Sequence, residues 1–200
     1  MPIETFIFDL GNVLIDWDPA HLFRPYFGDE EKLHYFLEQV CPLEWHGHQD
    51  AGRDISEATE ARVKEFPDWE DAIRAYYGRW REMFLGPITG TVDLLKQLKD
   101  NGFRLYALSN WNAGLFPQTV NDYPFLQVFD GILLSSEAGT RKPDPRIYRL
   151  LLDRYAIDPA SAVFIDDREE NVRAAERLGI RGIVFQGPGQ LKQEIFTLLS

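Results

Sequence analysis

The stretch FIFDLGNVLIDWD, residues 6–18, decides the fold class of this chain. Its first apolar run ends on Asp9, and a second apolar run follows Gly11. An apolar run without alternating polar residues is typical of a strand buried on both faces, as in a parallel sheet. Aspartate is rarely buried without a partner, so a carboxylate at the end of such a strand calls for a structural or chemical reason.

Further short apolar segments follow along the chain. Strands are predicted at residues 4–9, 104–109, 131–135, 162–166 and 181–185. Between the later strands, apolar residues recur at helical spacing, as in Ile147, Leu150, Leu151 and Tyr155. Strands that alternate with helices predict an α/β fold: a Rossmann-like parallel sheet with helices on both faces and right-handed crossovers.

Residues 16–86 do not follow this alternation. They hold about half of the aromatic residues and all four histidines, so their composition differs from that of the rest. Amphipathic helices are predicted at 29–40 and 68–84, with Asp29 and Asp68 as N-caps. A helical insertion directly after a strand that ends on a carboxylate predicts a lid over that strand end. A subdomain with only a packing role is the alternative.

The composition excludes several classes of partner. The net charge is −11, the reverse of what a polyphosphate backbone attracts, so nucleic acid is not an expected partner. No apolar stretch approaches the roughly 18 residues that span a bilayer, so no membrane association is expected, and the N-terminus lacks the basic region of a signal peptide. The single cysteine, Cys41, excludes an intramolecular disulfide and fits a reducing cytoplasm, which is the predicted location.

Polar residues stand where the predicted strands end, and ligand sites of open α/β sheets form beyond the carboxyl ends of strands. These residues are Asp9, Ser109, Asn110, Lys142, Asp166 and Asp167. Clustered carboxylates repel one another unless a cation or protons intervene, and an all-oxygen set favours a hard cation such as Mg²⁺. A nearby lysine offsets further negative charge, which predicts phosphate handling without a Walker A loop. One carboxylate could then attack phosphorus and form an acyl phosphate.

Four motifs carry a resemblance to a known family. They are FDLGNVL (8–14), LSN (108–110), RKPDPRIY (141–148) and FIDDREENVRAA (164–175). In this order they resemble the haloacid dehalogenase-like hydrolases, over the whole chain and including a helical cap after the first strand. Within that superfamily the chain looks most like bacterial sugar phosphatases of the α-D-glucose-1-phosphate phosphatase type.

The resemblance implies a metal site at the first strand end. Asp9 would ligate Mg²⁺, the backbone carbonyl of Gly11 would be a second ligand, and Asp167 a third. Asp166 would ligate weakly or hold a metal-bound water. Asn171 would order the waters of the metal.

The resemblance also assigns the chemistry. Asp9 would be the nucleophile. Ser109 and Asn110 would bind the phosphoryl oxygens, and Lys142 would stabilise both Asp9 and the transferring phosphoryl group.

Position 11 departs from the family pattern. Most phosphatases of the superfamily carry a second aspartate there as general acid and base, whereas Gly11 keeps only the backbone ligand. Loss of general acid–base catalysis costs roughly 10²–10⁴ in rate, which slows such an enzyme without abolishing its activity. Three interpretations stay open: a phosphatase whose acid is water, the substrate or a cap residue; a 2-haloacid dehalogenase that uses Asp9; and a non-catalytic binding protein on this fold. Asp16 and Asp18 are candidate acids, although helix capping is the simpler interpretation of both.

The segment LEWHGHQDAGRDIS, residues 43–56, is interpreted as a loop of the cap with solvent-exposed histidines. If this loop faces Asp9, Trp45 and His46 are candidates for selecting the sugar. A His-x-His pair alone supplies too few ligands for a zinc site.

The predicted domains are a catalytic α/β core, residues 1–15 and 87–200, and a helical cap, residues 16–86. The predicted function is Mg²⁺-dependent hydrolysis of a small phosphorylated metabolite, a sugar phosphate in the first instance, through an aspartyl-phosphate intermediate.

Overall fold

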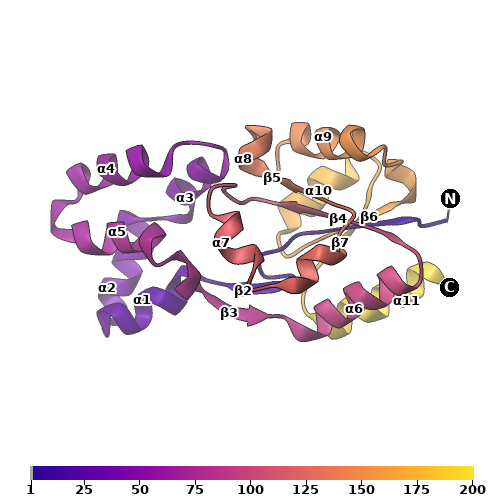
Figure 1. Ribbon diagram of the computed structural model, residues 1–200, viewed down its shortest axis with the longest axis horizontal. Helices are drawn as coiled ribbons and strands as arrows, with labels where there is room; N and C mark the ends of the chain where they lie inside the picture. The colour runs from indigo at the N-terminus through magenta and orange to yellow at the C-terminus, as the bar shows by residue number, and fades with distance from the viewer. Residues whose placement is uncertain (1) are drawn as a thin grey trace.

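A parallel sheet of five strands, in the order β5-β4-β1-β6-β7, forms the centre of the fold (Figure 1). The computed structural model describes residues 2–200. The strands are β1 Thr5–Phe8, β4 Arg104–Ser109, β5 Gly131–Leu134, β6 Ala162–Asp166 and β7 Arg181–Val184. Their bounds agree with the predicted ones to about one residue, and the predicted fold class is confirmed.

Helices cover both faces of the sheet (Figure 1). On one face, α6 (Thr89–Asp100) and α11 (Pro188–Leu199) pack into one apolar core with β1. On the other face, α9 (Pro145–Tyr155) and α10 (Glu169–Glu176) form a second core with β6. Burial on both sides explains why β1 and β6 read as continuous apolar runs in the sequence.

The strand register brings the polar strand ends to one edge. Phe8, the last residue of β1, pairs with Ala107 of β4 and with Ile165 of β6. Asp9 therefore lies level with Asp166, and the same edge carries the end of β4. A parallel sheet thus places side chains from distant parts of the sequence within reach of one another.

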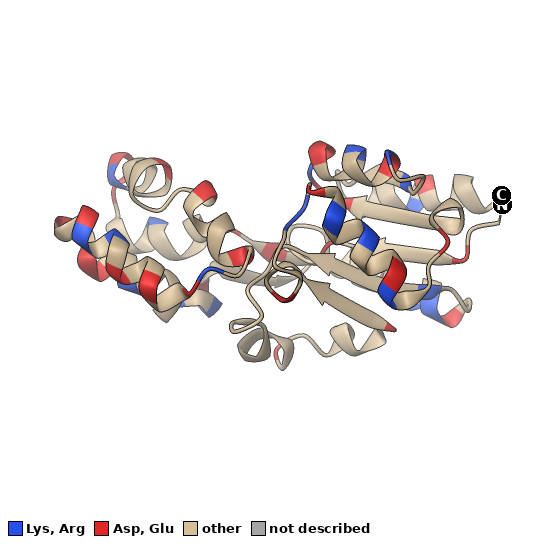
Figure 2. Ribbon diagram, turned by 90° about the horizontal axis from the view of Figure 1, so that it is seen from above, with Lys and Arg blue, Asp and Glu red and all other residues tan. Residues whose placement is uncertain are grey.

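A second lobe, which we call the cap, follows β1 and lies beyond this edge, as both Figure 1 and Figure 2 show. It contains α1 Pro19–Phe27, α2 Glu30–Tyr35, α3 Leu43–Asp50, α4 Ile55–Glu65 and α5 Glu70–Gly78. Two short antiparallel strands, β2 (Ile15–Trp17) and β3 (Phe84–Pro87), join it to the sheet. The predicted boundaries after residues 15 and 86 fall inside this ribbon, and the exact division of the chain stays a prediction.

Two shorter α-helices, α7 (Phe116–Val120) and α8 (Ser135–Ala138), and a π-helical turn (Phe36–Val40) are also present. Short 3₁₀ turns lie at Pro67–Trp69, Trp80–Met83, Pro124–Val128 and Pro159–Ser161. Within residues 2–200, no helix combines the length and the hydrophobicity needed to cross a bilayer.

The caps of the helices test the sequence predictions individually. Asp29 caps α2 through bonds from the N–H groups of Glu31 and Lys32, as predicted. Asp18 caps α1, which confirms the simpler interpretation of this residue. Asp68 does not act as an N-cap, because a 3₁₀ turn that begins at Pro67 already contains it.

The loop interpretation of residues 43–56 is wrong, because α3 occupies its first half. Burial of Trp45, His46 and Gln49 stabilises this helix although Gly47 lowers its intrinsic propensity. The pair of His46 Nε2 and Asp50 Oδ2, 3.3 Å apart at i and i+4, adds to it. His46 is therefore buried rather than exposed, whereas His48 is exposed.

Candidate active site

Asp9 follows β1 directly, and its backbone N–H donates to the carbonyl of Ile165 at 2.8 Å. Its side chain is mostly buried. Oδ1 accepts a hydrogen bond from the N–H of Leu10 at 2.7 Å and lies 2.9 Å from Nζ of Lys142. Within residues 2–200, no donor bonds to Oδ2. One oxygen of this carboxylate is thus anchored, and the other is free.

Lys142 connects the carboxylates of Asp9 and Asp166. Its Nζ lies 2.9 Å from Asp9 Oδ1 and donates to Asp166 Oδ2 at 2.6 Å, and the residue is 1% exposed. Burial alone would lower the pKa of this lysine, but Asp166 and Asp9 outweigh burial and raise the pKa. The ammonium group therefore stays charged.

The side chain of Asn110 holds the backbone of Lys142. Its Oδ1 accepts from the Lys142 N–H at 2.8 Å, and its Nδ2 donates to the Lys142 carbonyl at 3.0 Å. The sequence predicted a contact between Asn110 and phosphoryl oxygens. These two bonds support a positioning role, and the contact of Asn110 with phosphoryl oxygens stays a prediction.

Asp166 ends β6 and is fully buried. Its Oδ1 accepts from the N–H of Arg168 and from Nδ2 of Asn171, both at 2.9 Å, while Oδ2 faces Lys142. Both oxygens are therefore supplied with donors, which suits a carboxylate that positions Lys142. The predicted contact of Asp166 with a metal through water, and the predicted ordering of waters by Asn171, stay predictions.

The carboxylates of Asp9, Asp166 and Asp167 each offer an oxygen within 4.8 Å of the other two. Burial raises the pKa of Asp9 to about 7, opposed by Lys142 and reinforced by Asp166. Burial, followed by the charge of Asp166, also raises the pKa of Asp167. Such carboxylates bind protons more tightly than isolated carboxylates do, unless a cation takes the place of the protons. An all-oxygen cluster of this kind fits a hard divalent cation such as Mg²⁺.

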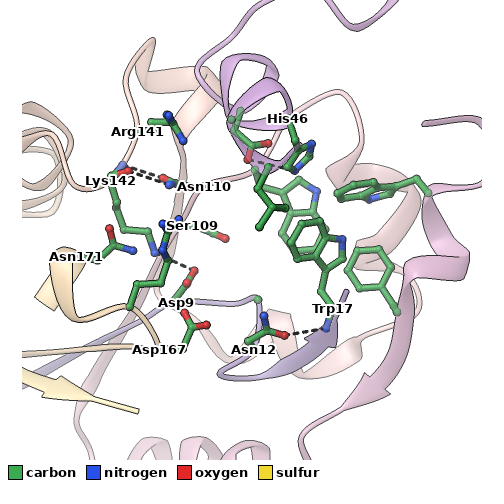
Figure 3. A pocket seen from close by; sticks show the side chains of 18 residues that line it. Asp9, Asn12, Trp17, His46, Ser109, Asn110, Arg141, Lys142, Asp167 and Asn171 are labelled. Atoms are coloured by element: carbon green, nitrogen blue, oxygen red, sulfur yellow. Dashed lines mark hydrogen bonds and ion pairs between the residues drawn. The ribbon is translucent and has the colours of Figure 1, made fainter. Parts of the chain in front are cut away.

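A cavity of about 340 Å³ opens in front of this cluster (Figure 3). Asp9, Gly11, Ser109, Lys142 and Asp167 all line it. Thus the structure brings these sequence-predicted residues together, although their roles stay predictions. Figure 3 shows Asp9, Lys142 and Asp167 on one side of the cavity, with Trp17 and His46 on the opposite side.

The opposite wall of the cavity is aromatic. It is formed by Trp17, Trp80, Phe84 and Trp111. Phe84 stacks on Trp111 with ring centroids 5.5 Å apart, and Trp17 lies 5.7 Å from Trp80. Because these rings come from β2, β3, the turn before β3 and the loop after β4, the wall joins the cap to the sheet.

The two predicted specificity residues of the cap lie in different places. His46 lines the cavity, stacks on Trp17 at 5.4 Å, and contacts Tyr77 Oη through Nδ1 at 3.0 Å. Burial lowers the pKa of His46, although Asp50 acts in the opposite sense. Trp45 instead packs edge-to-face on Tyr76 inside the cap and does not line the cavity. Of the two, only His46 lies at the cavity, and its role in selecting a sugar stays a prediction.

Several residues of the cavity escaped the sequence reasoning, among them Asn12, Asp50 and Arg141. Asn12 has a φ of 57°, and its side chain accepts from the N–H of Trp17, which shapes the turn after Asp9. Asparagine tolerates the left-handed region, so the Gly-Asn pair was the available signal. Arg141 directly precedes Lys142, and Asp50 lies one helical turn after His46, but nothing in one sequence separates such residues from surface charges.

Comparisons with known proteins agree on one family. A family model described as "Hydrolase: haloacid dehalogenase-like hydrolase" matches residues 3–179. A sesquiterpene phosphatase of Aspergillus oryzae is 35% identical over 99 residues, which are 50% of this chain and 50% of that protein. A drimenol cyclase of Aspergillus calidoustus is 26% identical over 203 residues, covering 99% of this chain and 37% of that protein. The chain thus spans half or less of these curated relatives.

A solved structure is similar over nearly the full length. It is an enzyme of the same family from Bacteroides thetaiotaomicron, in complex with magnesium and inorganic phosphate. The TM-score is 0.72 at 26% identity, and the match covers 92% of this chain and 95% of that one. That enzyme therefore shares the sheet and the additional helical lobe and accommodates both a cation and a phosphate.

Proposed function

This chain belongs to the haloacid dehalogenase-like hydrolases, and we propose that it hydrolyses a small phosphomonoester, in the first instance a sugar phosphate. One observation carries the proposal. Nζ of Lys142 lies within 2.9 Å of both Asp9 and Asp166, and the carboxylates of these two residues and of Asp167 cluster beside a cavity that Asp9, Lys142 and Asp167 line. A phosphate-binding relative with magnesium and a phosphatase among the curated relatives support it.

The reaction begins with Asp9. A carboxylate oxygen attacks phosphorus, the bond between phosphorus and the leaving oxygen breaks, and the electron pair departs with the alcohol. Because Gly11 has no side chain, this oxygen takes its proton from water or leaves as a stable anion. Water then attacks phosphorus of the acyl phosphate, the bond to Asp9 breaks, and phosphate leaves while the proton of the water passes to solvent.

Lys142 acts in both steps through its position. Its charge favours the ionised form of Asp9, which is the form that attacks. The same charge lies next to the phosphoryl group and stabilises its additional negative charge in the transition state. Asn110 and Asp166 keep the ammonium group in place.

The carboxylates of Asp9 and Asp167 and the carbonyl of Gly11 would hold Mg²⁺, with Asp166 behind them. When bound, such a cation neutralises the carboxylates and polarises a phosphoryl oxygen. Burial and mutual repulsion raise the pKa values of Asp9 and Asp167, so their negative charges lack compensation in the free protein. A divalent cation would supply that compensation.

A panel of sugar phosphates and nucleotides, assayed for phosphate release with Mg²⁺, tests the proposal. Asp9→Asn abolishes turnover, whereas Asp93→Asn, an exposed aspartate on α6, does not. EDTA abolishes phosphate release, and added Mg²⁺ restores it. Normal turnover of Asp9→Asn would show that the nucleophile is wrongly assigned.

The absence of a side chain at Gly11 keeps the dehalogenase alternative open, because displacement of halide needs no general acid. The acidic cluster around Asp9 argues against it, since an attack on carbon gains nothing from a metal site. Release of chloride from 2-chloropropionate in the presence of EDTA would establish that activity. No turnover of any phosphate ester with Mg²⁺ would support a non-catalytic binding protein.

A further inference from the structure

Arg141 has an environment unlike that of any other arginine among residues 2–200. It is half-buried, and it makes neither an ion pair nor a hydrogen bond with a described residue. The other arginines without an ion pair, at positions 53, 149, 177 and 181, are exposed. A guanidinium group stays charged at all physiological pH values, so partial burial without an anion costs free energy.

The structure makes room for this guanidinium on the cavity wall. It lies against Gly47 of α3, where a Cβ atom would come within 3 Å of two of its atoms, so any larger residue would displace it. The bonds between Asn110 and Lys142 fix the adjoining backbone. Figure 3 shows Arg141 above Lys142 and Asn110, at the end of the cavity away from Asp9 and Asp167.

The other cationic side chains of the cavity already have carboxylate partners. Lys142 contacts Asp9 and Asp166, and Arg168 lies 2.5 Å from Glu170. Arg141 and Asp50 lie beyond ion-pair distance, although the charge of Arg141 opposes the rise that burial causes in the pKa of Asp50, and Asp50 Oδ2 lies 3.3 Å from Nε2 of His46.

The remaining polar groups of that end are also engaged. His46 uses its second nitrogen for Tyr77, and aromatic rings form the rest of the opposite wall. Arg141 is therefore the free cation of this cavity among the described residues.

We propose that Arg141 binds a second anionic group, a phosphate or a carboxylate, on the part of the substrate that leaves. The inference rests on the proposed function, which places the first phosphate at Asp9. A planar guanidinium binds either anion through two parallel hydrogen bonds, which lysine cannot imitate. Both ends of the substrate would then carry negative charge, while its middle lies against the aromatic wall.

Three sugars that differ only at carbon 6 test this. Glucose 1-phosphate has no second anion, glucose 1,6-bisphosphate has a phosphate there, and glucuronic acid 1-phosphate has a carboxylate. Calorimetric affinities for the Asp9→Asn protein with Mg²⁺ separate binding from turnover, and kcat/KM of the unaltered protein follows catalysis. We expect one or both of the sugars with a second anionic group to be preferred over glucose 1-phosphate by roughly 10- to 100-fold. This is the size of a charged hydrogen-bonded contact. Which of the two is preferred identifies the anion.

Arg141→Gln, made both in the Asp9→Asn protein and in the otherwise unaltered protein, reduces this preference to about threefold or less. The change lies mainly in Kd and KM. Arg141→Lys restores part of it, because charge returns without the planar fork. Arg149→Gln, which removes an exposed arginine of α9, keeps the full preference. A thermal unfolding midpoint close to that of the parent protein shows that each variant is folded.

The outcomes separate this inference from the proposed function. Equal affinities for the three sugars, or no binding, or a preference that survives in Arg141→Gln, overturns the role of Arg141. Phosphate release from all three sugars with equal efficiency leaves the phosphatase proposal intact and rejects this one. A preference in binding that depends on Arg141, without turnover of any of the sugars, supports the anion site and contradicts the phosphatase proposal.

Discussion

Gly11→Asp is expected to install the proton donor that position 11 lacks. A Cβ atom built on Gly11 has no atom within 4 Å, and the backbone there is outside the left-handed region, so a side chain fits without strain. Position 11 lines the cavity two residues after Asp9. Nearby carboxylates raise the pKa of the new aspartate by repulsion, which favours the protonated form that a general acid needs.

The gain depends on the leaving group. A general acid contributes at most roughly 10²–10⁴ in rate, and we expect a gain of roughly 10- to 100-fold for an imported one. Glucose 6-phosphate, whose alcohol is a poor leaving group, gains this factor in kcat. 4-Nitrophenyl phosphate, whose phenolate leaves without a proton, gains little.

The assay is phosphate release with saturating Mg²⁺ for Gly11, Gly11→Ala, Gly11→Asn and Gly11→Asp. Alanine controls for the added bulk, and asparagine has the same shape as aspartate without an acidic proton. Only the aspartate variant shows a gain that grows with the basicity of the leaving group. An equal gain for both substrates, or an asparagine variant as fast as the aspartate variant, refutes the view that this site lacks a proton donor.

Further predictions concern residues that hold the cavity in shape. Asn110→Ala removes both bonds to the backbone of Lys142, and we expect kcat to fall roughly 10- to 100-fold, since each bond stabilises the native arrangement by about 0.5–1.5 kcal/mol; an unchanged kcat contradicts the positioning role. Burial raises the pKa of Cys41 to about 12, so at pH 8 a thiol reagent labels the protein only after unfolding, and stability falls as pH rises from about 8.5, where the unfolded thiol ionises, towards 12. Rapid labelling of the native protein contradicts this. Gly47→Ala displaces the flexible end of Arg141 while changing the unfolding midpoint little. We therefore expect a smaller preference for a sugar with a second anionic group.

The sheet could be predicted because its strands carry their own signal. Strands buried on both faces, such as β1 and β6, carry runs of consecutive apolar residues, and polar residues mark where these runs end. The ribbon of β2 and β3 lacked such a signal, since it has only a few residues and its burial is partial. The helix α3 was missed because its stability comes from burial of Trp45 and His46 in the cap rather than from local propensity.

For the site, the sequence predicted which residues converge but not what each side chain binds. Asp9 and Lys142 were identified by their places at strand ends, and the structure brings them within 2.9 Å. The family resemblance implied a phosphate contact for Asn110, but the hydrogen bonds of its side chain to a backbone 32 residues away could not be foreseen. Such partners depend on distances between loops, which no local pattern in a single sequence contains. The same holds for Arg141, whose significance is the lack of a partner.

The acidic cluster itself bears on the choice between an enzyme and a non-catalytic binding protein. Asp9, Asp166 and Lys142 are almost entirely buried, and Asp167 adds a further negative charge at the same place. Removing an ion from water costs several kcal/mol even after relaxation, and apolar residues of similar volume are often as stable or more stable than a buried ion pair. A protein that only needed this sheet edge to be folded would gain by replacing the cluster. The arrangement is reasonable only if the free charges interact with something that enters the cavity, and a phosphoryl group with its cation satisfies the carboxylates and the ammonium together.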